Sequence, residues 1–235
     1  MKRRFSKLMI FRWLLGLAIM GIFLTLALQL HGKHYFMFSF MILFSALLLV
    51  YWRFEHQPIK TTTLMFMATL IALAVIGRLI FAAIPSFQAA SFVIIMGGMA
   101  LGPELGFVVG ATTALVSNLF LGQGPWTPWQ MFAWGLMGFT AALIAHTVIG
   151  KRRLPLAIFG GLWGFGFGWL MDAWYVLAYV QPLTGKAFLT AALVSVKFDA
   201  YHAAANVIFL ILFANLWQQL FQRLNDKYDF LPTQK

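Results

Sequence analysis

The sequence predicts an all-α integral membrane protein with about eight transmembrane helices, in which a two-helix N-terminal hairpin precedes a six-helix core. Hydrophobic residues make up 62% of the chain and charged residues only 10%, and the mean hydropathy is +0.84. A soluble domain of 235 residues has too little polar surface to cover so much apolar material. Lipid is therefore the expected solvent for most of the chain.

The apolar residues form a series of runs, and a helix needs about 20 such residues to cross the hydrocarbon. The expected spans cover residues 8–30, 35–52, 62–83, 89–101, 105–121, 131–149, 155–180 and 199–221. The first run is longer than the apolar region of a secretory signal, so we interpret it as an anchor. Residues 1–56 contain few glycines and few polar groups and are predicted to be an accessory hairpin. Residues 57–235, rich in Gly, Pro and Trp, are predicted to be the functional core.

The net charge of +11 comes from basic residues at the ends of the apolar runs, not from a stripe on one face. This pattern sets membrane topology and does not indicate a nucleic-acid partner. With the N-terminus inside, twelve Lys and Arg residues fall in inner segments, whereas the outer segments hold only Lys33 and Lys186. We therefore expect both termini in the cytoplasm.

A loop rich in proline and tryptophan, residues 122–130, is expected at the outer surface. Pro125 and Pro128 fix their own φ angles and restrict the preceding residues, so the loop has few conformations. Trp126 and Trp129 are amphipathic rings that favour headgroup depth. They belong either to an ordinary interfacial belt or to the rim of a ligand site.

Small residues recur at spacings of four within the core, which places them on one helix face and lets another backbone approach. They are Ala68 and Ala72, Gly106 and Gly110, and Gly160, Gly164 and Gly168. The glycine sets predict packing inside the protein. The alanine pair is equally suited to internal packing and to docking a partner subunit.

Ionisable side chains inside membrane spans are costly and so point to paired or functional groups. They are Arg78, His146, Asp172, Lys197, Asp199 and His202. Arg78 lies near the outer end of its span, where it either snorkels to the surface or anchors an acidic or amide-rich ligand. His146, beside the basic residues 151–153, is expected at the inner interface.

Asp172 lies well inside the bilayer and needs a partner. Its candidates are Lys197, Asp199, His202 and Asn206, of which the last three share one helix face through spacings of three and four. The group forms either a structural Asp–Lys or Asp–His clamp or a ligand contact. Nearby aromatic residues, Trp134 among them, either line a site for a large planar ligand or pack in the core.

Several classes of chemistry have no motif here. The chain has no cysteine, no Gly-x-x-x-x-Gly-Lys-Ser/Thr phosphate loop and no His-Glu-x-x-His zinc motif. We therefore expect no ATP hydrolysis by this chain alone, no metal site, no resident cofactor and no enzymatic activity.

The core resembles a known family in several stretches. They are Gly77-Arg78 with Ile84-Pro85, Gly97 to Pro103, Gly106 to Asn118, Leu121 to Gly135, and Phe198-Asp199 with His202-Ala203 and Asn206. Together they are similar to the S-component, the substrate-binding membrane subunit, of an energy-coupling factor (ECF) vitamin transporter. The proline and tryptophan loop resembles the cobalamin subgroup.

The resemblance implies a six-helix protein of a prokaryotic cell membrane that captures a vitamin at the outer face. It implies docking on a transmembrane coupling subunit driven by two cytoplasmic ATPases, with toppling in the membrane to release cargo. The family's docking motif corresponds to Ala68 and Ala72. Its substrate contacts correspond to Trp126, Trp129, Gln130, Trp134, Asp172, Asp199, His202 and Asn206, to which the reading of the ionisable groups adds Arg78.

Cobalamin is the first expected ligand, because a corrin is large, partly apolar and flanked by amides, and riboflavin is the alternative. A rival hypothesis is an intramembrane enzyme that uses Asp172, Asp199 and His202 as acid–base groups. An autonomous carrier is a third possibility, but it predicts two related halves, and no internal repeat is apparent in the sequence.

Overall fold

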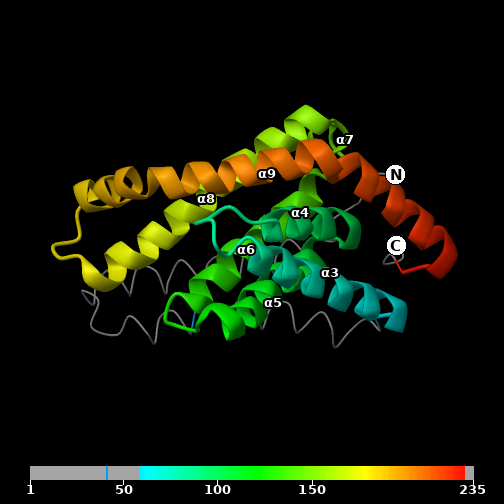
Figure 1. Ribbon diagram of the computed structural model, residues 1–235, viewed down its shortest axis with the longest axis horizontal. Coiled ribbons are helices and arrows are strands. Elements are labelled where there is room, and N and C mark those ends of the chain that lie inside the picture. Colours follow the sequence, from blue (N-terminus) through cyan, green and yellow to red (C-terminus); the bar gives the residue numbers. More distant parts are fainter. Residues whose placement is uncertain (1–40, 42–58, 231–235) are drawn as a thin grey trace, which may run out of the picture.

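A computed structural model describes residue 41 and residues 59–230 of the chain, and in these residues every regular element is a helix (Figure 1). The core runs in the order α3 (Thr61–Ile80), α4 (Ala90–Leu101), α5 (Pro103–Leu121), α6 (Thr127–Ile144), α7 (Val148–Lys151), α8 (Arg153–Tyr179) and α9 (Gly185–Tyr228). The hairpin predicted for residues 1–56 lies outside the described residues, except for Met41.

Helices α3, α5, α8 and α9 are each long and apolar enough to cross a membrane. This agrees with the predicted all-α integral membrane class. The 12 residues of α4 are apolar but shorter than a full span. The predicted total of about eight transmembrane helices is not confirmed.

Several helix boundaries differ from the predictions, and the largest difference is at the start of the last helix. The last helix begins at Gly185 instead of residue 199, because Thr184 caps its start by accepting a hydrogen bond from the Ala187 amide at 3.2 Å. Its 44 residues span roughly 66 Å, more than the hydrocarbon of a bilayer, and Figure 1 shows it bending towards its C-terminal end. Helix α6 begins at Thr127, so four of the nine residues of the predicted loop 122–130 lie in its first turn.

Glycines form the contact between α4, α5 and α6. A Cβ atom at Gly98 or Gly106 would overlap the backbone of Gly138, and one at Gly110 would overlap the carbonyl oxygen of Trp134. These helices therefore approach backbone to backbone, as the glycine spacing on α5 predicts.

The α8–α9 hairpin is also closed by glycines, here from α8 alone. A Cβ atom at Gly160 would meet the Leu210 side chain, at Gly164 the Ala203 backbone, and at Gly168 the Asp199 carboxylate. The prediction that this glycine run packs internally is confirmed.

Aromatic and polar contacts, not glycines, join the α3–α6 bundle to the α8–α9 hairpin. The ring centroids of Phe92 on α4 and Trp217 on α9 are 4.9 Å apart. Trp134 on α6 stacks on Phe167 of α8, with 5.3 Å between the ring centroids. Ser91 on α4 shares a hydrogen bond with the His202 ring on α9.

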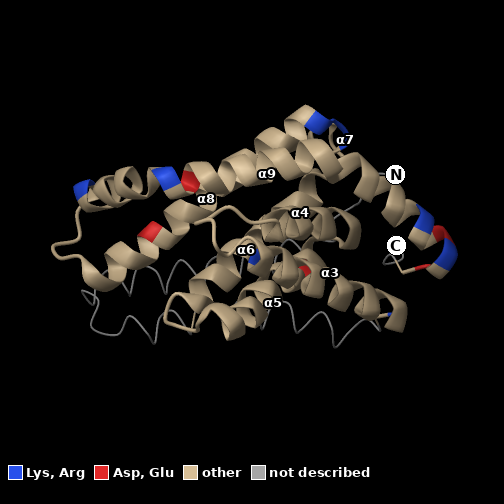
Figure 2. Cartoon of the chain, viewed as in Figure 1, with Lys and Arg blue, Asp and Glu red and all other residues tan. Residues whose placement is uncertain are grey.

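At the other end of the core, the beginning of α3 meets the end of α9. Lys60 Nζ lies 2.6 Å from the Asp229 carboxylate, Thr63 donates to the Phe230 carbonyl oxygen, and the rings of Phe66 and Phe230 are 3.9 Å apart. Figure 2 shows basic residues gathered around α7 and at this end of α9. This is the end that the positive-inside rule assigns to the cytoplasm.

Candidate ligand-binding site

Arg78, in the last turn of α3, points towards α5 and α6. Its Nη1 group donates to Ser117 Oγ at 2.5 Å and to Asn118 Oδ1 at 2.6 Å, and its guanidinium carbon lies 4.9 Å from the centroid of the Trp134 ring. The side chain is half-buried. Of the two interpretations open from the sequence, snorkelling to the surface is therefore not the one observed.

Asn118 extends this polar contact to the loop that precedes α6. Its Nδ2 group donates to Thr127 Oγ1 at 3.0 Å and to Gln130 Oε1 at 2.8 Å, and Thr127 in turn donates to Gln123 Oε1 at 2.8 Å. Hydrogen bonds thus link the last turn of α3 to the loop through the side chains of Arg78, Ser117, Asn118, Thr127, Gln130 and Gln123. We call these side chains the amide network.

Ser117 and Asn118 are absent from the site predicted from the sequence, because that prediction combined the ionisable groups of the spans with the contacts implied by the family resemblance, and these two residues are in neither set. A usable signal was present. An amide and a hydroxyl side by side in an apolar run, a few residues before its outer end, need internal hydrogen-bond partners just as a charge does.

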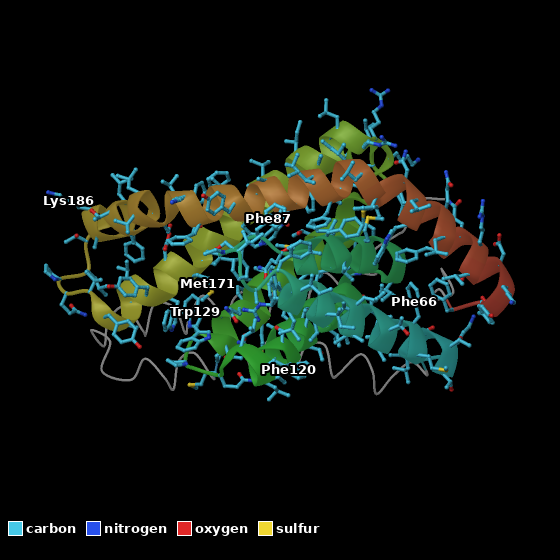
Figure 3. The ribbon with its side chains drawn as sticks, in the orientation of Figure 1. Phe66, Phe87, Phe120, Trp129, Met171 and Lys186 are labelled. Atoms are coloured by element: carbon cyan, nitrogen blue, oxygen red, sulfur yellow. The ribbon has the colours of Figure 1, made fainter. Side chains whose placement is uncertain are left out.

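One tryptophan of the loop, Trp126, packs against the C-terminal end of α8. Trp126 is half-buried and meets Trp174 edge to face at 6.1 Å, and Trp174 meets Tyr179 in the same way at 5.7 Å. Trp129, labelled in Figure 3, lies in the first turn of α6 and is also half-buried. An aromatic group therefore borders the amide network at the loop before α6.

Asp172 and Asp199 share a single hydroxyl group. Ser195 Oγ lies 2.7 Å from Asp172 Oδ2 and 3.2 Å from Asp199 Oδ2. Of the two alternatives left open from the sequence, a clamp of Asp172 with Lys197 or His202 is not observed, since Lys197 lies over the Tyr201 ring and His202 shares its hydrogen bond with Ser91. Ser195 is four residues before Asp199, a spacing that places both side chains on one helix face, and it is absent from the predicted site.

A serine hydroxyl has one proton, so it donates to one of the two carboxylates at a time. The other carboxylate is left with free acceptor capacity. Asp172 is half-buried and Asp199 is only 4% exposed, so Asp172 is the more accessible acceptor.

Four of the predicted contact residues, Trp134, Asp199, His202 and Asn206, are buried. His202 Nε2 lies 2.6 Å from Ser91 Oγ, and Asn206 Nδ2 donates to the Gly160 carbonyl oxygen at 2.9 Å. Asp199, His202 and Asn206 do share one buried face of α9, as the spacing predicts. Through these hydrogen bonds, His202 attaches α9 to α4 and Asn206 attaches α9 to α8. The face of the Trp134 ring packs against the Arg78 guanidinium.

The remaining candidates have accessible surface. The half-buried ones are Arg78, Trp126, Trp129, Gln130 and Asp172. Ala68 and Ala72, on α3, are exposed. His146 is exposed in the turn after α6, as expected for an interfacial residue.

Comparison with known proteins identifies the family. Residues 58–220 match the family model of the ECF-type riboflavin transporter, S component. The chain belongs to this family. The S component is also 28% identical, over 156 residues, to UPF0397 proteins of Aliivibrio fischeri strains MJ11 and ATCC 700601 / ES114; the matches cover 58% of this chain and 81% of each relative. No solved structure matches it.

Family membership makes the chain a multi-pass membrane protein and the substrate-binding subunit of a vitamin transporter, not an enzyme. The same membership implies an ECF module with a coupling subunit and ATPases. The expected cobalamin specificity is not supported. The family's description names riboflavin, which was the alternative ligand.

Proposed function

We propose that this S component binds riboflavin at its outer face and delivers it to an ECF module whose ATPases supply the energy for uptake. Besides the family match, one observation supports riboflavin: the amide network reaches from Arg78 to Gln130, which follows Trp129 directly in the chain. Riboflavin is a planar heteroaromatic ring with hydrogen-bonding edges and a polyhydroxyl tail. A planar ring suits Trp126 and Trp129, and its edges suit the amides and the guanidinium.

The polyhydroxyl tail gives the acidic residues a role. Ligand hydroxyls are hydrogen-bond donors, and the carboxylates of Asp172 and Asp199 are acceptors that, among the described residues, share Ser195 as their donor. We propose Asp172 as the direct contact because it is the more exposed. Trp134, Asp199, His202 and Asn206 then shape the site from within the core.

The outer face of α3 supplies the proposed docking surface for the coupling subunit. Ala68 and Ala72 are exposed, and around them lie the exposed apolar residues Leu64, Met65, Leu73 and Ile76. Small residues at a spacing of four permit close helix–helix contact in a membrane. With both termini in the cytoplasm, toppling of the subunit carries the ligand inward.

Titration of the purified full-length chain tests the ligand. In detergent, riboflavin fluorescence should be quenched on one-to-one binding, and cobalamin should not compete. Trp126→Leu should weaken riboflavin binding, whereas Trp169→Leu should not, because Trp169 is 58% exposed on α8 and contacts Phe165 instead of the loop. Saturable cobalamin binding without riboflavin binding would contradict the proposal.

Uptake tests the docking surface separately. Ala68→Leu with Ala72→Leu should leave riboflavin binding unchanged but abolish uptake by cells that also express the ECF module. Ala204→Leu, at another exposed alanine on α9, is the matched control and should retain uptake. Unchanged uptake in the α3 variant would refute this surface.

A further inference from the structure

Arg78 is a cation in an apolar helix whose partners are all neutral. In the described part of the chain, its contacts are Ser117, Asn118 and the face of the Trp134 ring, and no carboxylate pairs with it. A charge in a membrane span costs several kcal/mol unless it is compensated, so this arrangement is not the one that stability alone favours.

The guanidinium also keeps unused donors. A guanidinium has five N–H groups, and both hydrogen bonds made by Arg78 come from Nη1. Among residues 59–230, neither Nε nor Nη2 has a hydrogen-bond partner. These two nitrogens form the edge of the fork that donates two parallel hydrogen bonds to adjacent acceptors.

The neighbouring indole adds an independent observation. Trp134 is fully buried, and its Nε1 group has no hydrogen-bond acceptor within the described residues. A buried donor without an acceptor is rare in native proteins. Donors are therefore in excess around Arg78, whereas acceptors are in excess around Asp172.

We infer that Arg78 orients the ligand by donating from Nε and Nη2 to two adjacent acceptors on one edge of the flavin ring. This inference rests on the proposed function. A flavin ring offers two such edges, each consisting of a carbonyl oxygen and the neighbouring ring nitrogen. The ring edge then lies at the α3 side of the site, and the hydroxyl tail extends towards Asp172.

The orientation follows from charge and hydrogen-bond polarity. Arg78 has only donors to offer, so it attracts carbonyl oxygens and anions and repels cations. A carboxylate has only acceptors to offer, so Asp172 suits hydroxyl groups. A ligand with acceptors at one end and donors at the other fits in one direction only.

The test combines a variant with altered ligands. Riboflavin affinity is measured for the full chain and for Arg78→Gln, together with the affinities of the 2-thio and 4-thio analogues, in which a sulfur replaces one ring carbonyl oxygen and accepts hydrogen bonds more weakly. We expect Arg78→Gln to weaken riboflavin binding about tenfold to a hundredfold. The native chain should discriminate against one thio analogue, and Arg78→Gln should lose that discrimination.

Control variants separate this role from a structural one. Arg78→Lys keeps the charge without the fork and should give an intermediate affinity. Arg152→Gln, at an exposed arginine before α8, should change nothing. The thermal midpoint of each variant in detergent verifies that it is folded.

Three outcomes would overturn all or part of this assignment. Failure of the native chain to bind riboflavin would overturn the proposed function and the inference with it. Riboflavin binding that survives Arg78→Gln would overturn the inference alone. Equal weakening of riboflavin and both thio analogues would show that Arg78 supports the fold of the site without contacting the ring edge.

Discussion

The α3–α6 bundle and the α8–α9 hairpin both pack through glycines, but in different ways. In the bundle, glycines on two helices face each other, so that Gly106 and Gly138 bring backbone against backbone. In the hairpin the glycines lie on α8 only, and two of the three meet side chains of α9. A side chain can rotate away from an added atom, whereas a backbone cannot. The comparison suggests that the bundle is the stiffer of the two units.

The polar groups of the two units differ as well. The bundle contains amides, hydroxyls and one guanidinium that satisfy most of one another's hydrogen bonds. The hairpin contains two carboxylates that share one hydroxyl. Substitutions should therefore be most costly in the glycine contact of the bundle and least costly where a hairpin side chain can move.

The largest loss of stability is expected for Gly138→Ala. The added Cβ would overlap the Gly106 carbonyl group, and overpacking of this kind costs about 3 kcal/mol or more when no side chain can yield. Gly166→Ala is the matched control, because its Cβ would meet only Trp163 at an ordinary contact distance of 3.6 Å. Thermal unfolding in detergent should show a large drop for the first variant and little change for the second.

Ser91→Ala should cost about 2 kcal/mol, because it leaves the buried His202 ring nitrogen without its partner between bundle and hairpin. Thr69→Ala removes only a bond to the carbonyl oxygen of Met65 in its own exposed turn, so its effect should stay within about 0.5 kcal/mol. Equal thermal unfolding midpoints for the two variants would mean that the hydrogen bond between Ser91 and His202 does not stabilise the packing of the bundle against the hairpin.

A loss of about 1.5 kcal/mol is expected for Ser195→Ala, since the shared donor of Asp172 and Asp199 disappears. Adding Asp172→Asn should restore part of the stability, because it removes one of two like charges and supplies an amide donor. If the double variant is less stable than Ser195→Ala, repulsion between the two carboxylates is not the main cost.

The smallest effect, about 1 kcal/mol, is expected for Gly160→Ala. Its Cβ would meet the far end of the flexible Leu210 side chain, which can change rotamer. A loss as large as that of Gly138→Ala would contradict the proposed difference in stiffness between the units.

Features that depend on local spacing were predictable. The glycine spacings predicted the close helix–helix contacts inside the protein. The intervals between Asp199, His202 and Asn206 predicted that they share one face of α9. The early start of α9 had a local signal too, since Thr184 is a good N-cap residue. It was missed because the segment after Thr184 was assigned to a loop.

Features that depend on a second helix were not predictable. Whether Arg78 turns inward is decided by Ser117 and Asn118, 39 and 40 residues further along the chain. The complete burial of Trp134 depends likewise on Phe167 and Arg78. No periodicity within α3 or α6 carries that information.

The contact of Lys60 with Asp229, and of Thr63 with Phe230, brings the two ends of the described core together at one corner. Because these two ends are adjacent, they can be joined and the chain can be opened at another position. A circular permutant that joins Phe230 to Ile59 through a short flexible linker, and opens in the exposed turn between His146 and Thr147, should keep all of these helices in place. Its new ends would lie next to α7, at the same end of the molecule as the old ones.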